Sequence, residues 1–185
     1  MKTWDLAALS AVKEIVEFAR KRVPNPSLEL LRQEMDSVID NCFAGAQPVS
    51  DEEWTILGAT AFALGDILGL IQDSDGDFCI KTARFVAGKQ RDDGTENISR
   101  FGSTGIIVRM HDKVARLENL RGRSTPPANE TLNDTIMDMV GYAIVGILWA
   151  RGSFFWPLAD EKLMTVAESD QAQKIRRVIS SKAHV

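Results

Sequence analysis

Apolar residues recur every three or four positions along most of the chain, which is the spacing of one face of an α-helix. This pattern predicts a first helix that begins near Leu6 and ends before Pro24. It predicts a second helix from Leu28 to about Phe43, with Ser27 as the N-cap. No alternation of period two persists, so we expect no β-strands.

A helix that is apolar on almost every side is predicted for residues 54–71, preceded by a capping box of Ser50 and Glu53. Such a helix is typical of the centre of a bundle. The later predicted segments are a helix-breaking turn at 73–77, a short helix over 78–89 stopped by Gly94, a helix capped by Ser103 or Thr104 and running to Leu120, a loop at 121–129, the longest helix from Asn129 or Thr131 to about Arg151, and a charged helix over 160–179.

These elements predict an all-α fold, a multi-helix bundle in a single domain over residues 1–185, because no internal repeat or long linker divides the chain. The longest apolar run, residues 139–150, is shorter than the roughly 20 residues of a membrane span, and the first residues lack the pattern of a signal peptide. We therefore expect a cytoplasmic protein. The helices over 54–71 and 139–150 are apolar on more faces than a small bundle covers, which predicts a homo-oligomer.

Composition narrows the possible functions. The net charge of −4 gives no overall basic field, so direct nucleic-acid binding is not expected. The two cysteines, Cys42 and Cys79, lack the spacing of a zinc site and are predicted to be core thiols. His111 and His184 are the only histidines, and no Gly-x-Ser-x-Gly elbow is present, so a hydrolase triad is not indicated.

Three acids mark the start of the helix predicted after residue 129. Asp134 and Asp138 are four residues apart on one face, and Glu130 precedes them by one turn. Carboxylates this close to a core must be paired or bind a cation, and oxygen ligands suit Mg²⁺ or Mn²⁺ better than zinc. The alternative is that these acids are a solvated face, or form salt bridges with basic residues of the preceding helix.

That preceding helix carries one mixed face. Arg109, Asp112, Lys113 and Arg116 combine a potential metal ligand with three cations. A metal-bound polyphosphate requires this composition, since Lys and Arg hold the non-bridging phosphate oxygens. An ordinary network of ion pairs has the same composition, so both interpretations stay open at this point.

The two helices together resemble a known family. The stretch Gly105–Leu120, followed after a loop by Asn129–Ala143, resembles the phage nucleotide-modification-associated domain, which is related to the MazG-like all-α nucleoside triphosphate pyrophosphohydrolases. Residues 89–101 resemble that family's Lys-x-x-Asp-Tyr-Gly segment, with Asp93 where a Tyr is common. The resemblance covers roughly residues 78–156. The Glu-Glu-x-x-Glu metal motif of MazG proteins is missing, and its candidate replacements are Asp112 or the acids Glu34 and Asp36.

The resemblance implies a fold of the MazG-like type, with a nucleotide-binding core at 78–156, N-terminal helices of unassigned role at 1–75, and a terminal helix and tail at 160–185. It implies Mg²⁺- or Mn²⁺-dependent cleavage of a nucleoside triphosphate to a monophosphate and pyrophosphate, in the host cytoplasm if the chain is phage-encoded. The residues implied are Asp112 and Asp138 for catalysis, Asp112, Glu130, Asp134 and Asp138 for the metal, Lys89, Arg109, Lys113 and Arg116 for the phosphates, and Asn97 and Tyr142 for the nucleoside.

Two functions of other classes remain open. One is a protein that binds or sequesters a nucleotide without turnover, which the missing Glu-rich motif favours. The other is an all-α interaction or scaffolding domain whose charged helices only pair with each other.

Overall fold

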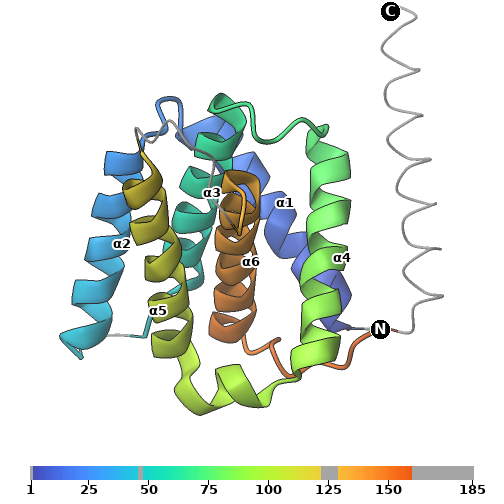
Figure 1. The fold of residues 1–185 in the computed structure, drawn as a ribbon. Coiled ribbons are helices and arrows are strands. Elements are labelled where there is room, and N and C mark those ends of the chain that lie inside the picture. Colours follow the sequence, from blue (N-terminus) through green and yellow to red (C-terminus); the bar gives the residue numbers. More distant parts are fainter. Residues whose placement is uncertain (1, 46–47, 122–128, 160–185) are drawn as a thin grey trace, which may run out of the picture.

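The computed structural model describes residues 2–45, 48–121 and 129–159. Over these ranges the chain forms six α-helices and no β-strand, which confirms the predicted all-α class (Figure 1). The helices are α1 (Trp4–Arg22), α2 (Leu28–Phe43), α3 (Asp51–Ile67), α4 (Asp75–Asp93), α5 (Glu96–Leu120) and α6 (Leu132–Ala150).

Helices α3 and α6 form the centre of the bundle, as the apolar character of both segments predicts. Helices α1 and α4 cover one side of this pair, and α2 and α5 cover the other (Figure 1). The two central helices approach closely through glycine: a Cβ at Gly146 of α6 would fall 2.2 Å from the Trp54 ring of α3. Trp54 is fully buried there, so the size of Gly146 sets the distance between the helices.

Side-chain caps explain where the helices begin. The hydroxyls of Ser27, Ser74 and Thr131 each accept a backbone N–H three residues later, which satisfies an otherwise unpaired donor. The predicted capping box of Ser50 and Glu53 is present in both directions. The sequence predicted the caps Ser27 and Ser50, and Thr131 as an alternative to Asn129, whereas the cap at Ser74 was not predicted.

Two boundaries differ from the prediction. Ser74 caps α4, so residues 75–77 are the first turn of that helix instead of part of a helix-breaking turn. Helix α5 begins at Glu96, and its axis bends at Gly102, whose φ of 55° is accessible mainly to glycine. The predicted start at Ser103 or Thr104 thus marks the bend. Helix α5 spans 25 residues only by including this bend, and α6 has 19 residues, as do α1 and α4, so α6 is not the single longest helix that the sequence predicts.

A buried carboxylate fixes the lower end of α4. Asp5 of α1 is fully buried and accepts hydrogen bonds from Arg91 of α4, at 2.6 Å, and from the backbone N–H of Ala159, at 2.6 Å. Each carboxylate oxygen of Asp5 therefore accepts one hydrogen bond, which compensates for the water that the buried charge has lost. The contact joins α1, α4 and the segment after α6, and so positions the end of α4 that carries the candidate site.

Several predictions are not settled by the fold. The helix predicted at 160–179 and most of the loop at 121–129 lie outside the described residues. Self-association stays a prediction: most of α3 and α6 is covered within the chain itself, and the large exposed apolar side chains include Ile67 at the end of α3, at 66%, and Phe101 and Phe155, at 61% each. Within the described ranges, no helix is both long and apolar enough to cross a membrane.

Candidate functional site

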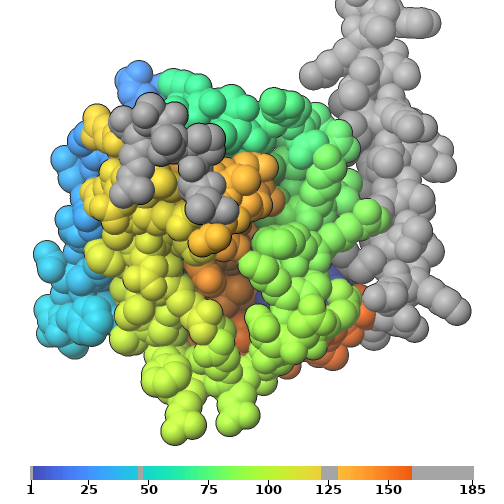
Figure 2. Space-filling model, in the orientation of Figure 1, coloured from blue at the N-terminus to red at the C-terminus, as the bar shows by residue number. Residues whose placement is uncertain are grey.

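A cleft of about 340 Å³ opens between α4 and α5, over the exposed side of α6. Figure 2 shows this face, with α6 (orange) lying behind and between α5 (yellow) and α4 (green). Its volume lies in the range of small-molecule sites, roughly 300–1,000 Å³. The lining residues are Phe85, Val86, Lys89, Gln90, Asp92 and Asp93 of α4, Gly94, Asn97, Ile98 and Arg109 of the α4–α5 connection and α5, and Asp138, Gly141, Tyr142 and Val145 of α6.

One part of the cleft wall is apolar and aromatic. Phe85, Ile98, Tyr142 and Val145 contribute it from three helices. The Lys89 ammonium lies 4.4 Å from the centroid of the Phe85 ring, in the range of a cation–π contact. This wall offers a flat ring or an apolar ligand group a surface to stack against.

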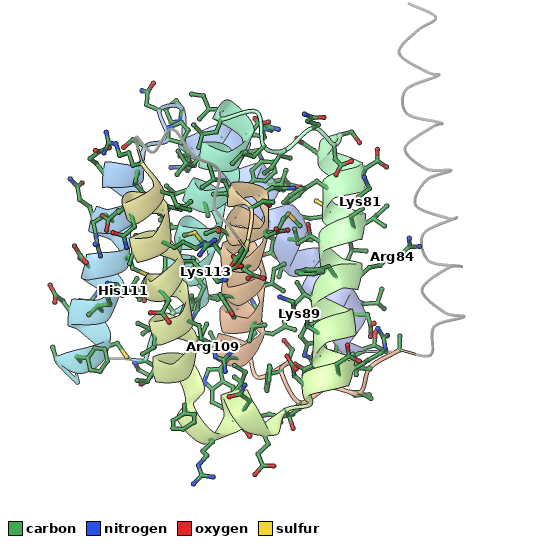
Figure 3. All side chains as sticks on the ribbon, in the orientation of Figure 1. Lys81, Arg84, Lys89, Arg109, His111 and Lys113 are labelled. Atoms are coloured by element: carbon green, nitrogen blue, oxygen red, sulfur yellow. The ribbon has the colours of Figure 1, made fainter. Side chains whose placement is uncertain are left out.

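Asp138 lies at the junction of this wall with the basic groups. Its Oδ1 accepts from the Lys89 ammonium at 2.7 Å, and its Oδ2 contacts the Lys113 ammonium at 2.8 Å. The Asp138 side chain is only 17% exposed. Figure 3 shows Lys89 reaching from α4 and Lys113 from α5 toward the intervening α6. One carboxylate therefore links three helices.

Glu130 extends this network toward the loop before α6. The Lys113 ammonium donates to Glu130 Oε1 at 2.8 Å. Arg116 donates to the Glu130 backbone carbonyl at 2.7 Å and to the Thr135 hydroxyl at 3.3 Å. Lys113 and Arg116 thus hold the start of α6 against α5, and neither lines the cleft directly.

The charges of this network stabilise each other. Burial raises the pKa of Asp138, but hydrogen bonds from Lys113 and Lys89 outweigh it and hold that pKa below its ordinary value. Burial lowers the pKa of Lys113, and the hydrogen bonds to Asp138 and Glu130 again prevail, so its pKa is raised. Asp138 and Lys113 are therefore both charged at neutral pH.

Arg109 differs from the other basic residues of the cleft. Its side chain is half-buried and lines the cleft from α5, below Lys113 in the view of Figure 3. The structure records neither a hydrogen bond nor an ion pair between Arg109 and any other described residue. A guanidinium offers five donors in a planar fork, so this side chain presents unused donors to the cleft.

Two of the predicted acids lie away from the cleft. The Asp134 carboxylate accepts from the Thr131 hydroxyl and backbone N–H, so it caps its own helix, and its pKa is lowered by these hydrogen bonds. Asp112 is exposed on α5 and does not line the cleft. Of the predicted site residues, the cleft brings together Lys89, Asn97, Arg109, Asp138 and Tyr142.

The donor set does not fit a metal bound by the four predicted acids. The Lys113 ammonium already bridges Asp138 and Glu130, where a cation shared by these two carboxylates would lie. Over residues 2–45, 48–121 and 129–159, no three His, Cys, Asp or Glu side chains are grouped so as to hold a metal ion. The salt-bridge interpretation of the acidic stripe therefore describes Asp138 and Glu130.

The alternative acids on α2 do not complete such a site. Glu34 and Asp36 do not line the cleft, and burial raises the pKa of Glu34. His111 also has a structural partner, because Arg32 of α2 donates to its Nε2 at 3.0 Å while also pairing with Glu118. These contacts hold α2, which contributes no residue to the cleft, against α5.

Several cleft residues were not predicted. Phe85 lies one helical turn before Lys89, and Val145 lies one turn after Tyr142. Residues one turn apart share a helix face, so this spacing could have identified Phe85 and Val145 as neighbours of the predicted site residues. Gln90, Asp92 and Asp93 follow Lys89 in sequence, beyond the predicted end of the helix at residue 89. The bend at Gly102, which brings Ile98 and Asn97 to the cleft, had no clear signal in the sequence.

Comparisons with protein-family models, curated proteins and solved structures found no match to this chain.

Proposed function

We propose that the cleft between α4, α5 and α6 binds a nucleoside triphosphate or a related phosphorylated nucleotide. The observation that carries the proposal is Arg109, a half-buried guanidinium without a partner among the described residues, on the wall of a cleft that also holds Lys89 and an aromatic surface. Phosphate oxygens are strong acceptors for such a fork, and a base needs a flat apolar surface. The resemblance to the phage nucleotide-modification-associated domain supports the same ligand class.

Arg109 and Lys89 would hold the phosphates, and Phe85 and Tyr142 would contact the nucleoside. Asn97 is exposed at the edge of the cleft, where its amide can donate to and accept from a base or sugar. Asp92 and Asp93 lie at the same end of α4 and offer acceptors to a sugar hydroxyl or an exocyclic amine.

The experiment is a thermal-shift and calorimetric titration with a panel of nucleoside mono-, di- and triphosphates. We expect the triphosphates to bind more tightly than the corresponding nucleosides, and Arg109→Gln to weaken binding by about tenfold, the loss of one bidentate charged contact. Arg121→Gln is the matched control, because Arg121 directly follows the last residue of the same helix and pairs with Glu29 away from the cleft. Equal binding by both variants would reject the site.

A second candidate is metal-dependent cleavage of the bound nucleotide to a monophosphate and pyrophosphate, in a MazG-like fold. The observation that favours it is Asp138, a carboxylate kept ionised at the edge of the phosphate end of the cleft. Because the side chains do not form a metal site by themselves, Mg²⁺ or Mn²⁺ would have to arrive with the nucleotide phosphates. Pyrophosphate release in the presence of Mg²⁺ supports the enzyme, and binding without products supports a sequestering protein. If there is neither binding nor product, the scaffolding alternative is supported.

A further inference from the structure

Cations outnumber carboxylates in the network around Asp138. Lys89, Lys113 and Arg116 contact the carboxylates of Asp138 and Glu130, and a fourth cation, Arg109, lines the same cleft without contacting either of them. Asp134 is exposed and engaged in its own helix cap, and the acids at the other end of the cleft lie on α4 beyond Lys89. The phosphate end of the cleft therefore favours an anion over a free divalent cation.

The Lys113 ammonium is fixed in the place of a bridging cation. It lies 2.8 Å from a carboxylate oxygen of Asp138 and 2.8 Å from one of Glu130, and its side chain is 17% exposed. A divalent cation shared by these carboxylates would have to displace the ammonium, which would then lose both partners in a largely buried position. Lys89 is different, because its side chain is 48% exposed and can contact a ligand without leaving Asp138.

We infer that the cleft binds its nucleotide as the metal-free phosphate anion, with the ammonium groups of Lys89 and Lys113 taking the place of the divalent cation that the family resemblance implies. The inference rests on the proposed nucleotide function. Lys113 keeps Asp138 and Glu130 neutralised, while Lys89 and Arg109 supply the donors to the phosphate oxygens from two sides of the cleft.

The test is calorimetric titration of the full-length protein with each of the four common deoxynucleoside triphosphates, once in excess EDTA and once in excess Mg²⁺. For the deoxynucleoside triphosphate that binds most tightly, we expect the dissociation constants in EDTA and in Mg²⁺ to agree within about threefold. A tenfold difference would correspond to about 1.4 kcal/mol of binding free energy. Binding only in Mg²⁺ would overturn the inference and leave the proposed function intact. No binding in either condition would overturn both.

Two lysine variants locate the metal-independent contact. Lys89→Gln is expected to weaken binding in EDTA by about tenfold, because a charge-assisted contact to phosphate is lost. Lys81→Gln is the matched control, since Lys81 lies on the same helix, is 63% exposed and pairs with Asp73 outside the cleft. Both side chains are exposed enough for the variants to fold, which circular dichroism verifies. Unchanged affinity of Lys89→Gln in EDTA would contradict the lysine contact.

Discussion

Replacing Asp138 with Asn separates the two roles that an acid at this position can have. Asn keeps the shape and one acceptor oxygen but removes the charge that holds Lys89 at 2.7 Å and Lys113 at 2.8 Å. If Asp138 is a structural anion among lysines, the variant loses stability and keeps its nucleotide. If it is an essential metal ligand, the variant loses the nucleotide.

The size of the stability loss follows from the two contacts. The Lys113 and Asp138 side chains are each 17% exposed, so solvent screens their contact only partly, whereas Lys89 is 48% exposed and contributes little. One lost hydrogen bond between charged groups costs about 1.5–3 kcal/mol. For a domain of this size, about 2 kcal/mol corresponds to a fall in Tm of roughly 6 °C.

The assay combines thermal melting with nucleotide titration in EDTA. We expect Asp138→Asn to melt lower and to bind the nucleotide at least as tightly as the wild type, because the substitution removes a negative charge near the bound phosphate. Asp112→Asn is the control on α5: its carboxylate is exposed and has no partner among the described residues, so we expect a change of less than about 0.5 kcal/mol. Loss of binding in Asp138→Asn with an unchanged Tm would refute this reasoning.

Three further changes test the fold and its charges. Asp5→Ala removes both hydrogen bonds of a fully buried carboxylate and leaves Arg91 with only its 3.3 Å hydrogen bond to the Ala159 carbonyl; we expect a loss of about 3 kcal/mol in urea unfolding, and a smaller loss would mean that water replaces the contact. Gly146→Val forces side-chain atoms into the Trp54 ring, and should cost about 3 kcal/mol or prevent folding, whereas Gly88→Ala, with open space at its Cβ, should not destabilise. Burial raises the pKa of Glu34, so the folded state binds this proton more tightly than the unfolded state does. The free energy of unfolding therefore falls as the pH rises above 4.5, the ordinary pKa of the group, until the carboxyl is ionised in the folded state as well. Glu34→Gln is therefore expected to stabilise the protein at neutral pH, with the gain vanishing in acid; a gain independent of pH would contradict that cause.

Local signals were sufficient to predict most of the helices. The apolar spacing and the caps Ser27, Ser50 and Thr131 located three N-termini, because capping is a contact between residues three apart. The same reasoning failed at residues 73–77, where an Asp- and Gly-rich segment typical of a turn contains the cap and first turn of α4. It also missed the helical residues before Gly102, since a glycine in the left-handed region lets two helical segments join at an angle.

The candidate site was predictable in part. Asp138 and Tyr142 are four residues apart in sequence, the spacing of one helix face, and both line the cleft with Lys89 and Arg109. This spacing could not show how each carboxylate is used, because that depends on partners from other helices. Asp134 and Asp138 share a face, yet one caps its own helix and the other contacts lysines 49 and 25 residues away in sequence.

The chain contains a single tyrosine, Tyr142, and it lines the proposed nucleotide site. An NMR spectrum of protein labelled with ¹³C only at tyrosine therefore reports on the cleft alone. We expect the Tyr142 ring signals to shift in a saturable way as a deoxynucleoside triphosphate is added, and Arg109→Gln to move the midpoint of this shift to higher ligand concentration. Ring signals that stay unchanged while calorimetry records nucleotide binding would place the ligand elsewhere and contradict the account.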